Sequence, residues 1–105
     1  MEEYFEALIK WISAEEGGRK ELPRQGTRYC PIIRLTEEKN NVDWSIDFVC
    51  PDFSESSEIE FEFLADRAPR WLVKTGIQYG LYEGRKKVAE IVVTKKIMGE
   101  NRIKR

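Results

Sequence analysis

The chain has 105 residues, of which 18 are basic, 19 are acidic and 41% are hydrophobic, so its net charge is −1. This length predicts one domain over residues 1–105, and the apolar content, with three tryptophans, excludes a disordered chain. No apolar run approaches the roughly 20 residues needed to span a bilayer, and the Met-Glu-Glu start lacks the basic residues of a secretory signal. We therefore expect a soluble cytoplasmic protein.

The first segment, residues 5–19, fits two structures on local evidence. One set of apolar residues has the spacing of an amphipathic helix: Phe5, Leu8, Ile9 and Ile12. A second set alternates as in a strand: Phe5, Ala7, Ile9 and Trp11. The glycines that follow, Gly17 and Gly18, fit either a phosphate-binding loop with Arg19 or a tight turn. A phosphate loop of the P-loop kind needs a helix behind it, and Pro23 with a strand beyond it does not supply one, so the turn is favoured.

The next segments predict strands separated by turn signals. Residues 29–35 form a short strand, in which Pro31 places the start at an edge or a bulge. Strict alternation of apolar and polar residues predicts half-buried strands over residues 42–49 and 58–64. Three acidic residues take the solvent face of the second of these strands: Glu58, Glu60 and Glu62. Several short strands of this kind suggest an antiparallel barrel or sandwich.

Residues 76–95 predict a β-hairpin, because Gly84 allows the positive φ of a tight turn between two strands. Alternation places three residues on the core-facing side of its first strand: Ile77, Tyr79 and Leu81. Tyr82 lies on the other face, where its ring is the better candidate for stacking on a base. Cations at the turn and near the C-terminus suit either a nucleic-acid backbone or a solubilising edge: Arg85, Lys86, Lys87, Lys95, Lys96, Arg102, Lys104 and Arg105.

Charge is distributed in four blocks along the chain. The net charges of residues 1–16, 17–36, 37–66 and 67–105 are −4, +4, −9 and +8. Antiparallel strands could bring opposite blocks together as cross-strand pairs. Alternatively, the molecule has two charged faces, one of them a basic patch for RNA or an acidic partner. We favour the first interpretation.

Two motifs, in order along the chain, resemble a known domain. The first is Ser-Ala-Glu-Glu-Gly-Gly-Arg from Ser13 to Arg19, followed by Tyr29-Cys30-Pro31, and the second is the hairpin over residues 76–93. They are similar to the opening loop and the last hairpin of the C-terminal, third domain of bacterial elongation factor Tu. The resemblance implies a single antiparallel six-stranded β-barrel with Greek-key-like connections, standing alone without the GTPase domain. It also implies that the first segment is a strand.

The resemblance constrains function less than it constrains fold. Glu83 and Gly84 match the hairpin residues with which the family contacts tRNA, but Ile32 and Arg85 replace a glutamine and a glycine of the family. The chain also lacks the phosphate-binding loop of a GTPase. We therefore expect the barrel to be reused for another purpose.

The composition argues against catalysis. The chain has no histidine, which removes the commonest general base and the commonest metal ligand. Its two cysteines cannot complete a structural zinc site, and we expect Cys30 and Cys50 to be free, small, buried side chains. We therefore predict no enzyme activity, no cofactor and no metal site.

The leading hypothesis is a non-catalytic binding module whose partner is another protein, for example as an immunity or inhibitor protein. The alternative is an RNA- or tRNA-binding accessory protein related to translation factors. Neither hypothesis involves a membrane or a small-molecule cofactor. The candidate contact residues for either partner are Arg19, Tyr82, Glu83, Gly84, Arg85, Lys86 and Lys87.

Overall fold

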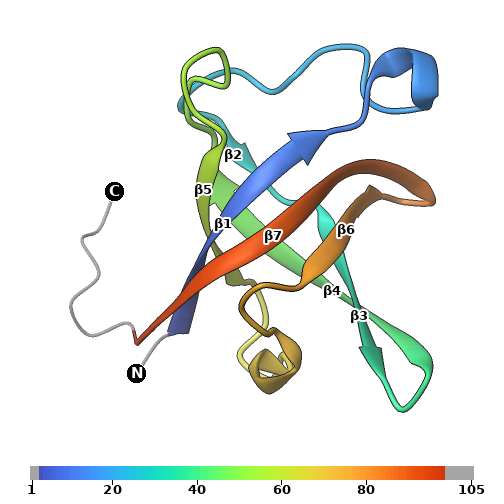
Figure 1. The fold of residues 1–105 in the computed structure, drawn as a ribbon, viewed down its shortest axis with the longest axis vertical. Coiled ribbons are helices and arrows are strands. Elements are labelled where there is room, and N and C mark those ends of the chain that lie inside the picture. Colours follow the sequence, from blue (N-terminus) through green and yellow to red (C-terminus); the bar gives the residue numbers. More distant parts are fainter. Residues whose placement is uncertain (1–2, 99–105) are drawn as a thin grey trace.

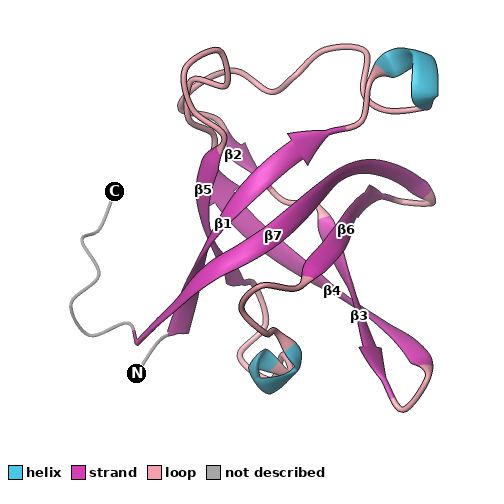
Figure 2. Ribbon diagram, viewed as in Figure 1, coloured by secondary structure: helices cyan, strands magenta, loops and turns pink. Residues whose placement is uncertain are grey.

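Seven strands and two 3₁₀ helices make up the part of the chain that the computed structural model describes, residues 3–98 (Figure 2). In chain order they are β1 (Glu3–Trp11), η1 (Ala14–Glu16), β2 (Arg28–Tyr29), β3 (Ile32–Glu37), β4 (Asn40–Val49), β5 (Glu58–Phe63), η2 (Arg70–Leu72), β6 (Gln78–Glu83) and β7 (Lys86–Met98). No helix among these residues is long and apolar enough to cross a membrane.

The sheet closes on itself into a barrel, because β4 pairs with β5 as well as with β3. The order around the barrel is β1-β5-β4-β3-β6-β7, and β7 pairs again with β1. β6 follows β5 in sequence but lies beside β3, which is the strand order of a Greek key. All pairs are antiparallel, and the short β2 pairs with β4 outside the ring. The predicted six-stranded antiparallel barrel with Greek-key connections is therefore confirmed (Figure 1).

The first segment is a strand, as the resemblance implies and as local evidence leaves open. Phe5, Ala7 and Ile9 are buried, whereas Leu8, which belongs only to the helical pattern, is 46% exposed. β1 pairs with β7 along its whole length and with β5 over four residues. This pairing on both sides outweighs the local preference for a helix.

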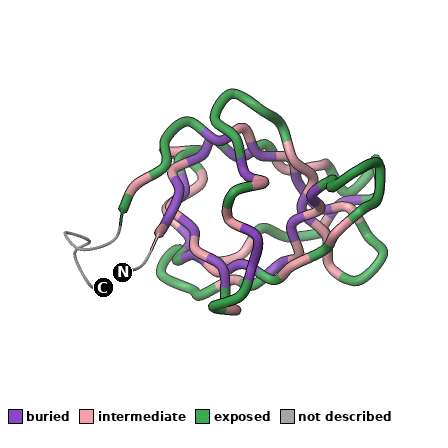
Figure 3. The backbone as a smooth tube through the Cα atoms, turned by 90° about the horizontal axis from the view of Figure 1, so that it is seen from below, coloured by how far each residue is buried: buried purple, intermediate pink, exposed green. Residues whose placement is uncertain are grey.

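The core fills the inside of the barrel. Phe5 and Phe61 stack across the β1–β5 pair with ring centroids 5.1 Å apart, and Phe63 meets Phe5 edge-on at 6.0 Å. Burial of each large apolar side chain contributes about 1.5–3 kcal/mol. Figure 3 shows buried positions recurring around the ring of backbone. The largest fully buried side chains include Phe5, Phe48, Phe61, Ile33, Leu35, Ile46, Leu81, Ile91, Val88 and Val93.

Two β-bulges bend the longest strand, β7. Val88 is an extra residue opposite β6, and Thr94 is an extra residue opposite β1. The carbonyl of Val88 accepts a hydrogen bond from the Ile12 amide at 2.9 Å, so the first bulge also holds the end of β1. Bulges bend a strand and increase its twist, which lets β7 curve around the barrel while it pairs with β1 and β6.

Pro31 interrupts a strand, in agreement with its predicted place at an edge or bulge. β2 and β3 pair with β4 in the same register on either side of it. Proline has no N–H to give to the ladder, but the Pro31 carbonyl accepts from the Ile46 amide at 3.0 Å. β2 and β3 are thus one strand along β4 with a gap in its hydrogen bonding at Pro31.

Two other expectations from the sequence are wrong. Ile77 was expected in the core, but it precedes β6 and is 49% exposed, because the chain turns at Gly76 with a φ of 81° before the strand begins. Cys30 was expected to be buried, but alternation next to buried Pro31 turns it to the exposed side. Both cysteines are free and Cys50 is buried, as expected.

Opposite charge blocks meet across the barrel wall, as the favoured interpretation predicts. Basic residues of the second block lie beside acidic residues of the third on β4, and the last block meets the first where β7 pairs with β1. The ion pairs between blocks of opposite net charge are Arg28–Asp47, Arg34–Asp43 and Lys96–Glu3.

Candidate binding site

The structure divides the predicted contact residues into three groups, one of which is the pair Arg19 and Glu83. Gly84, Arg85 and Lys86 are exposed at the tip of the β6–β7 hairpin, where Gly84 has a φ of 61° at the first position of a two-residue turn. Tyr82 and Lys87 instead lie opposite each other on the barrel wall. Of the cations predicted near the C-terminus, Lys95 and Lys96 belong to β7, whereas Arg102, Lys104 and Arg105 lie outside the described residues.

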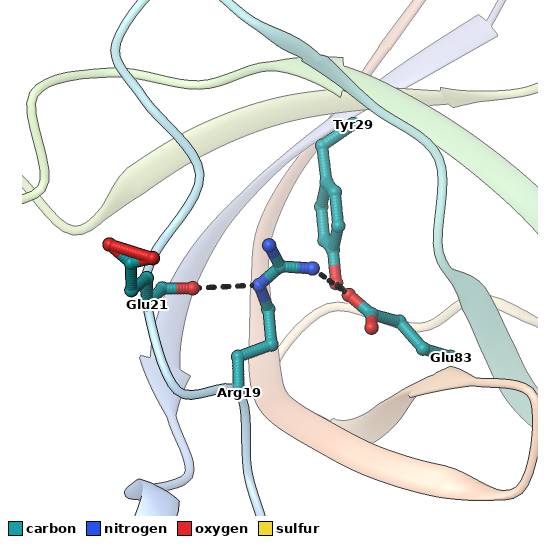
Figure 4. Close-up of polar contacts among 4 residues, drawn as sticks. All are labelled: Arg19, Glu21, Tyr29 and Glu83. Carbon is teal, nitrogen blue, oxygen red and sulfur yellow. Dashed lines mark hydrogen bonds and ion pairs between the residues drawn. The ribbon is translucent and has the colours of Figure 1, made fainter.

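Arg19 and Glu83 bind each other (Figure 4). A terminal nitrogen of Arg19 and the hydroxyl of Tyr29 both donate to the same carboxylate oxygen of Glu83. The Nε of Arg19 donates to the Glu21 carbonyl at 2.9 Å, and its guanidinium lies 5.4 Å from the centroid of the Tyr29 ring. The cluster therefore ties the segment between η1 and β2 to the base of the hairpin, so Arg19 and Glu83 have a structural role beside any contact with a partner.

The charges of this cluster are fixed at neutral pH. Partial burial opposes ionisation of Glu83, but the hydrogen bonds from Tyr29 and Arg19 outweigh it and hold the pKa of Glu83 below its ordinary value. Burial and the neighbouring Glu83 carboxylate raise the pKa of Tyr29. The Glu83 hydrogen bond raises the pKa of Arg19. An anion, a phenol and a guanidinium with these shifts hold the loop and do not exchange protons near pH 7.

The glycine pair before Arg19 is a turn, as predicted. Gly17 ends η1 with a φ of 98°. Gly18 donates its N–H to the Ser13 carbonyl at 2.8 Å, and a Cβ on it would lie 1.8 Å from the Ile12 carbonyl oxygen. The two glycines close the turn so that Arg19 reaches Glu83.

A groove opens where β3 and β6 separate. The ladder between them has three residue pairs, which end at Arg34 and Gly80. Beyond this point the η2–β6 connection lies against the opening, and the Tyr79 hydroxyl holds it there by accepting from the Lys74 amide at 2.8 Å and donating to the Leu72 carbonyl at 3.1 Å. The groove has a volume of about 320 Å³, and its lining residues are Arg34, Thr36, Leu72, Lys74, Ile77, Gln78, Tyr79, Gly80, Tyr82 and Lys87.

Internal contacts hold the polar side chains of the groove. The guanidinium of Arg34 lies 4.2 Å from the centroid of the Tyr82 ring and donates to both oxygens of Asp43 at 3.0 Å. Lys87 binds Glu90 at 2.8 Å. A Cβ on Gly80 would lie 2.9 Å from Tyr82 Cε1 and 3.1 Å from Lys87 Cε, so glycine allows both side chains to lie over the strand.

The lining of the groove is basic and partly apolar. It contains three cations and no carboxylate. Ile77 is exposed beside them, and Trp71, one residue before Leu72, is 61% exposed. Three other surface hollows of similar size each include acidic side chains: Glu6, Glu58 and Glu60 in one, Glu3, Asp47, Glu62 and Asp66 in another, and Glu16 and Glu90 in the last.

The sequence identified Tyr82 and Lys87 but missed the residues that complete the groove, Arg34, Lys74 and Gly80. The missing information is the Greek-key crossover, which brings β3 beside β6 although they are far apart in the chain. A glycine inside an alternating strand is the one local signal, since it often marks a place where other groups approach the backbone closely.

Comparison of the chain with protein-family models and with curated proteins finds no match. Within residues 3–98, no group of three or more cysteine and carboxylate side chains is placed to hold a metal ion. The functional argument therefore rests on the geometry of the described surface.

Proposed function

We propose that this chain is a non-catalytic module that binds another protein through the groove between β3, β6 and η2. The observation that carries this proposal is the lining of the groove, in which an arginine, two tyrosines and the exposed Ile77 lie together. Arginine, tyrosine and tryptophan are the residue types that contribute most to protein–protein interfaces. The internal contacts of Arg34 and Tyr79 hold the surface in shape before a partner arrives, which lowers the entropy cost of binding.

The biological setting that we propose is a cytoplasmic immunity or inhibitor protein built on a reused barrel. The six-stranded barrel and the tight hairpin at Glu83 and Gly84 support a relationship to the third domain of elongation factor Tu. An exposed free thiol at Cys30 is compatible with a reducing compartment. In such a protein the groove masks a partner's surface and performs no chemistry.

Site-specific photo-crosslinking in the cells that make this protein tests the proposal. A photoreactive residue replaces Ile77 in the groove, and a control protein carries it at Glu55, an exposed loop position outside the groove lining. We expect a discrete adduct from position 77 that protease removes and ribonuclease leaves intact. An adduct that ribonuclease removes, or equal labelling from both positions, contradicts the proposal.

The second candidate function is RNA binding at the hairpin tip. The observation that favours it is the exposure of Arg85 and Lys86 at a two-residue turn whose neighbouring acid, Glu83, is paired with Arg19. Phosphate contacts of this kind give affinity that falls steeply with salt.

Titration with tRNA at low and at physiological salt tests this candidate. Tight binding that weakens with salt and is lost when Arg85→Glu is combined with Lys86→Glu would support it. Absence of binding at low salt, or binding that the paired substitution leaves unchanged, would remove the hairpin tip from consideration.

A further inference from the structure

We infer that the groove binds an acidic, extended segment of the partner, with carboxylates placed on Arg34, Lys74 and Lys87 and an apolar side chain placed on Ile77. This inference rests on the proposed function, since it names the chemistry of the protein that the groove accepts. It follows from charge complementarity, because the groove lining contains three cations and no carboxylate. Asp43 and Glu90, which lie outside the lining, pair with Arg34 and Lys87, whereas the exposed side chain of Lys74 has no ion pair within residues 3–98.

Arg34 is the central anchor. Asp43 accepts hydrogen bonds from Nε and Nη2, so the other terminal nitrogen, Nη1, can donate to a second carboxylate. The Tyr82 ring beneath the guanidinium and the ion pair with Asp43 fix its plane. A guanidinium that is already oriented loses little entropy when it binds a carboxylate.

Lys74 and Lys87 supply the outer charges. Lys74 is exposed, and its backbone is fixed by the hydrogen bond from its amide to the Tyr79 hydroxyl. Lys87 is paired with Glu90, but their side chains are 38% and 32% exposed. An exposed pair of this kind contributes about 0–1 kcal/mol, so Lys87 can exchange Glu90 for a carboxylate of the partner at little cost.

The apolar part of the groove favours a polypeptide over a nucleic acid as the ligand. Ile77 is exposed and Leu72 is half-buried, so both gain from covering by an apolar side chain. A phosphate backbone offers nothing to these residues. The Tyr82 ring is less available to a base than sequence alone indicates, because Arg34 lies against one of its faces and its edge lies over Gly80.

Fluorescence anisotropy with three labelled probes of equal length tests the inference. The first probe is a peptide of alternating glutamate and leucine, the second replaces each glutamate by lysine, and the third is oligouridine RNA. We expect the acidic peptide to bind and the other two to bind at least about tenfold more weakly. Absence of acidic-peptide binding, or tighter binding of the RNA, overturns the inference.

Matched charge reversals locate the binding. Lys74→Glu reverses a groove cation whose exposed side chain makes no hydrogen bond or ion pair within residues 3–98, and Lys20→Glu is the control at an exposed cation outside the groove lining. We expect Lys74→Glu to weaken acidic-peptide binding by about tenfold or more, with little change for Lys20→Glu. Arg34→Gln is the second groove variant, and circular dichroism checks that it folds.

The outcomes separate the inference from the function on which it rests. Equal weakening by Lys74→Glu and Lys20→Glu shows adventitious attraction to the whole molecule and overturns the inference. A protein adduct at position 77 together with no acidic-peptide binding supports the proposed function but contradicts the inference that the bound segment is acidic. Absence of both the adduct and the peptide binding contradicts the proposed function as well as the inference.

Discussion

At the residue scale, the adjacent glycines at the end of η1 are required for different physical reasons. Gly17 has a φ of 98° and open space around it, so a side chain there meets only backbone strain. Gly18 has no positive φ, but a Cβ on it would lie 1.8 Å from the Ile12 carbonyl oxygen. The sequence alone does not distinguish the two glycines. Only the folded turn shows that Gly18 is packed against backbone and that Gly17 is not.

Alanine substitutions at the two glycines separate these effects. We expect Gly17→Ala to lower the free energy of unfolding by about 1–2 kcal/mol, the cost of a left-handed residue with a Cβ. Gly18→Ala should cost about 2–4 kcal/mol, because the backbone must move to admit the methyl group. Urea unfolding of both variants measures the difference, and a larger loss at Gly17 would show that the turn relaxes around Gly18.

Glu83 is the residue whose role differs most from its sequence interpretation. The sequence predicts it as a contact residue because it matches a hairpin position that meets tRNA in the domain that this chain resembles. In the structure its carboxylate accepts from Arg19 and Tyr29, which are 64 and 54 positions away in the chain. No local sequence pattern predicts contacts between residues so far apart in the chain. The role of Glu83 is therefore visible only in the folded structure.

The pH dependence of Glu83→Gln tests that role. The pKa of Glu83 in the folded protein lies below its ordinary value of 4.5, so its stabilisation is complete above the unfolded-state pKa and is lost as the pH falls through the folded-state pKa. At pH 7 we expect the variant to be less stable by about 1–2 kcal/mol, a value reduced for partial solvent exposure. The difference should narrow in acid.

Urea unfolding at pH 7 and at successively lower pH measures this effect, and Glu55→Gln, at an exposed glutamate of the β4–β5 loop, is the control. A difference between wild type and Glu83→Gln that stays constant into acid would mean that the carboxylate charge does not stabilise the cluster.

At the element scale, the β3–β4 hairpin carries strain in its turn. The two residues between paired Glu37 and Asn40 are Glu38 and Lys39, with φ values of 50° and 71°. A turn with two positive φ values favours asparagine and glycine, and neither central residue is of this type. The strands predicted over residues 29–35 and 42–49 left residues 36–41 between them, and in the structure β3 and β4 extend closer to the turn.

Lys39→Gly should stabilise the protein. Relief of left-handed strain of about 1–2 kcal/mol exceeds the added chain entropy of glycine, about 0.5–1 kcal/mol. We expect a gain of about 0.5–1 kcal/mol and a rise in Tm of about 2–8 °C. Lys39→Ala is the matched control, because it removes the same side chain and keeps the Cβ. An equal rise in Tm for both variants would assign the gain to lost charge and not to backbone strain.

The strands and turns also show which parts of the fold could be predicted from the sequence. Alternation located β4 and β5, and Gly84 located the β6–β7 turn, because a half-buried strand and a tight turn each have a local signature. β1 had two local signatures, and pairing with β5 and β7 decided between them. Pairing partners across a Greek key are non-local, which is why the β3–β6 groove did not emerge from patterns along the chain.

At the scale of the whole molecule, opposite charge blocks meet at some strand pairs, whereas like charges lie opposite each other at others, as Glu6 and Glu60 do and as Asp47 and Glu62 do. Arg34–Asp43 and Lys96–Glu3 each join two blocks. Exposed pairs of this kind add little stability, but they favour the correct strand neighbours because like charges placed opposite each other are destabilising. The ion pairs between opposite blocks thus favour the pairing of β3 with β4 and of β1 with β7 more than they raise the free energy of unfolding.

Closure of the barrel predicts how stability is distributed over the molecule. β7 pairs with both β1 and β6, and β4 pairs with both β3 and β5, so their central amides are held from two sides. The end of the β3–β4 hairpin, residues 36–41, is exposed and pairs only within itself (Figure 1). Segments with few buried contacts open locally at low free energy, whereas core strands exchange amide protons only on global unfolding.

Hydrogen exchange followed by NMR measures this distribution. We expect the amides of Ile46 and Ile91 to have the slowest exchange, with opening free energies equal to that of global unfolding by urea. Amides of residues 36–41 should exchange through local opening that urea affects little. If Ile91 exchanged as fast as the hairpin end, the β1–β7 seam would open independently, and the barrel would be a sheet that closes only part of the time. That outcome would also detach the groove from a rigid β6, since β7 is the strand that holds β6 in place.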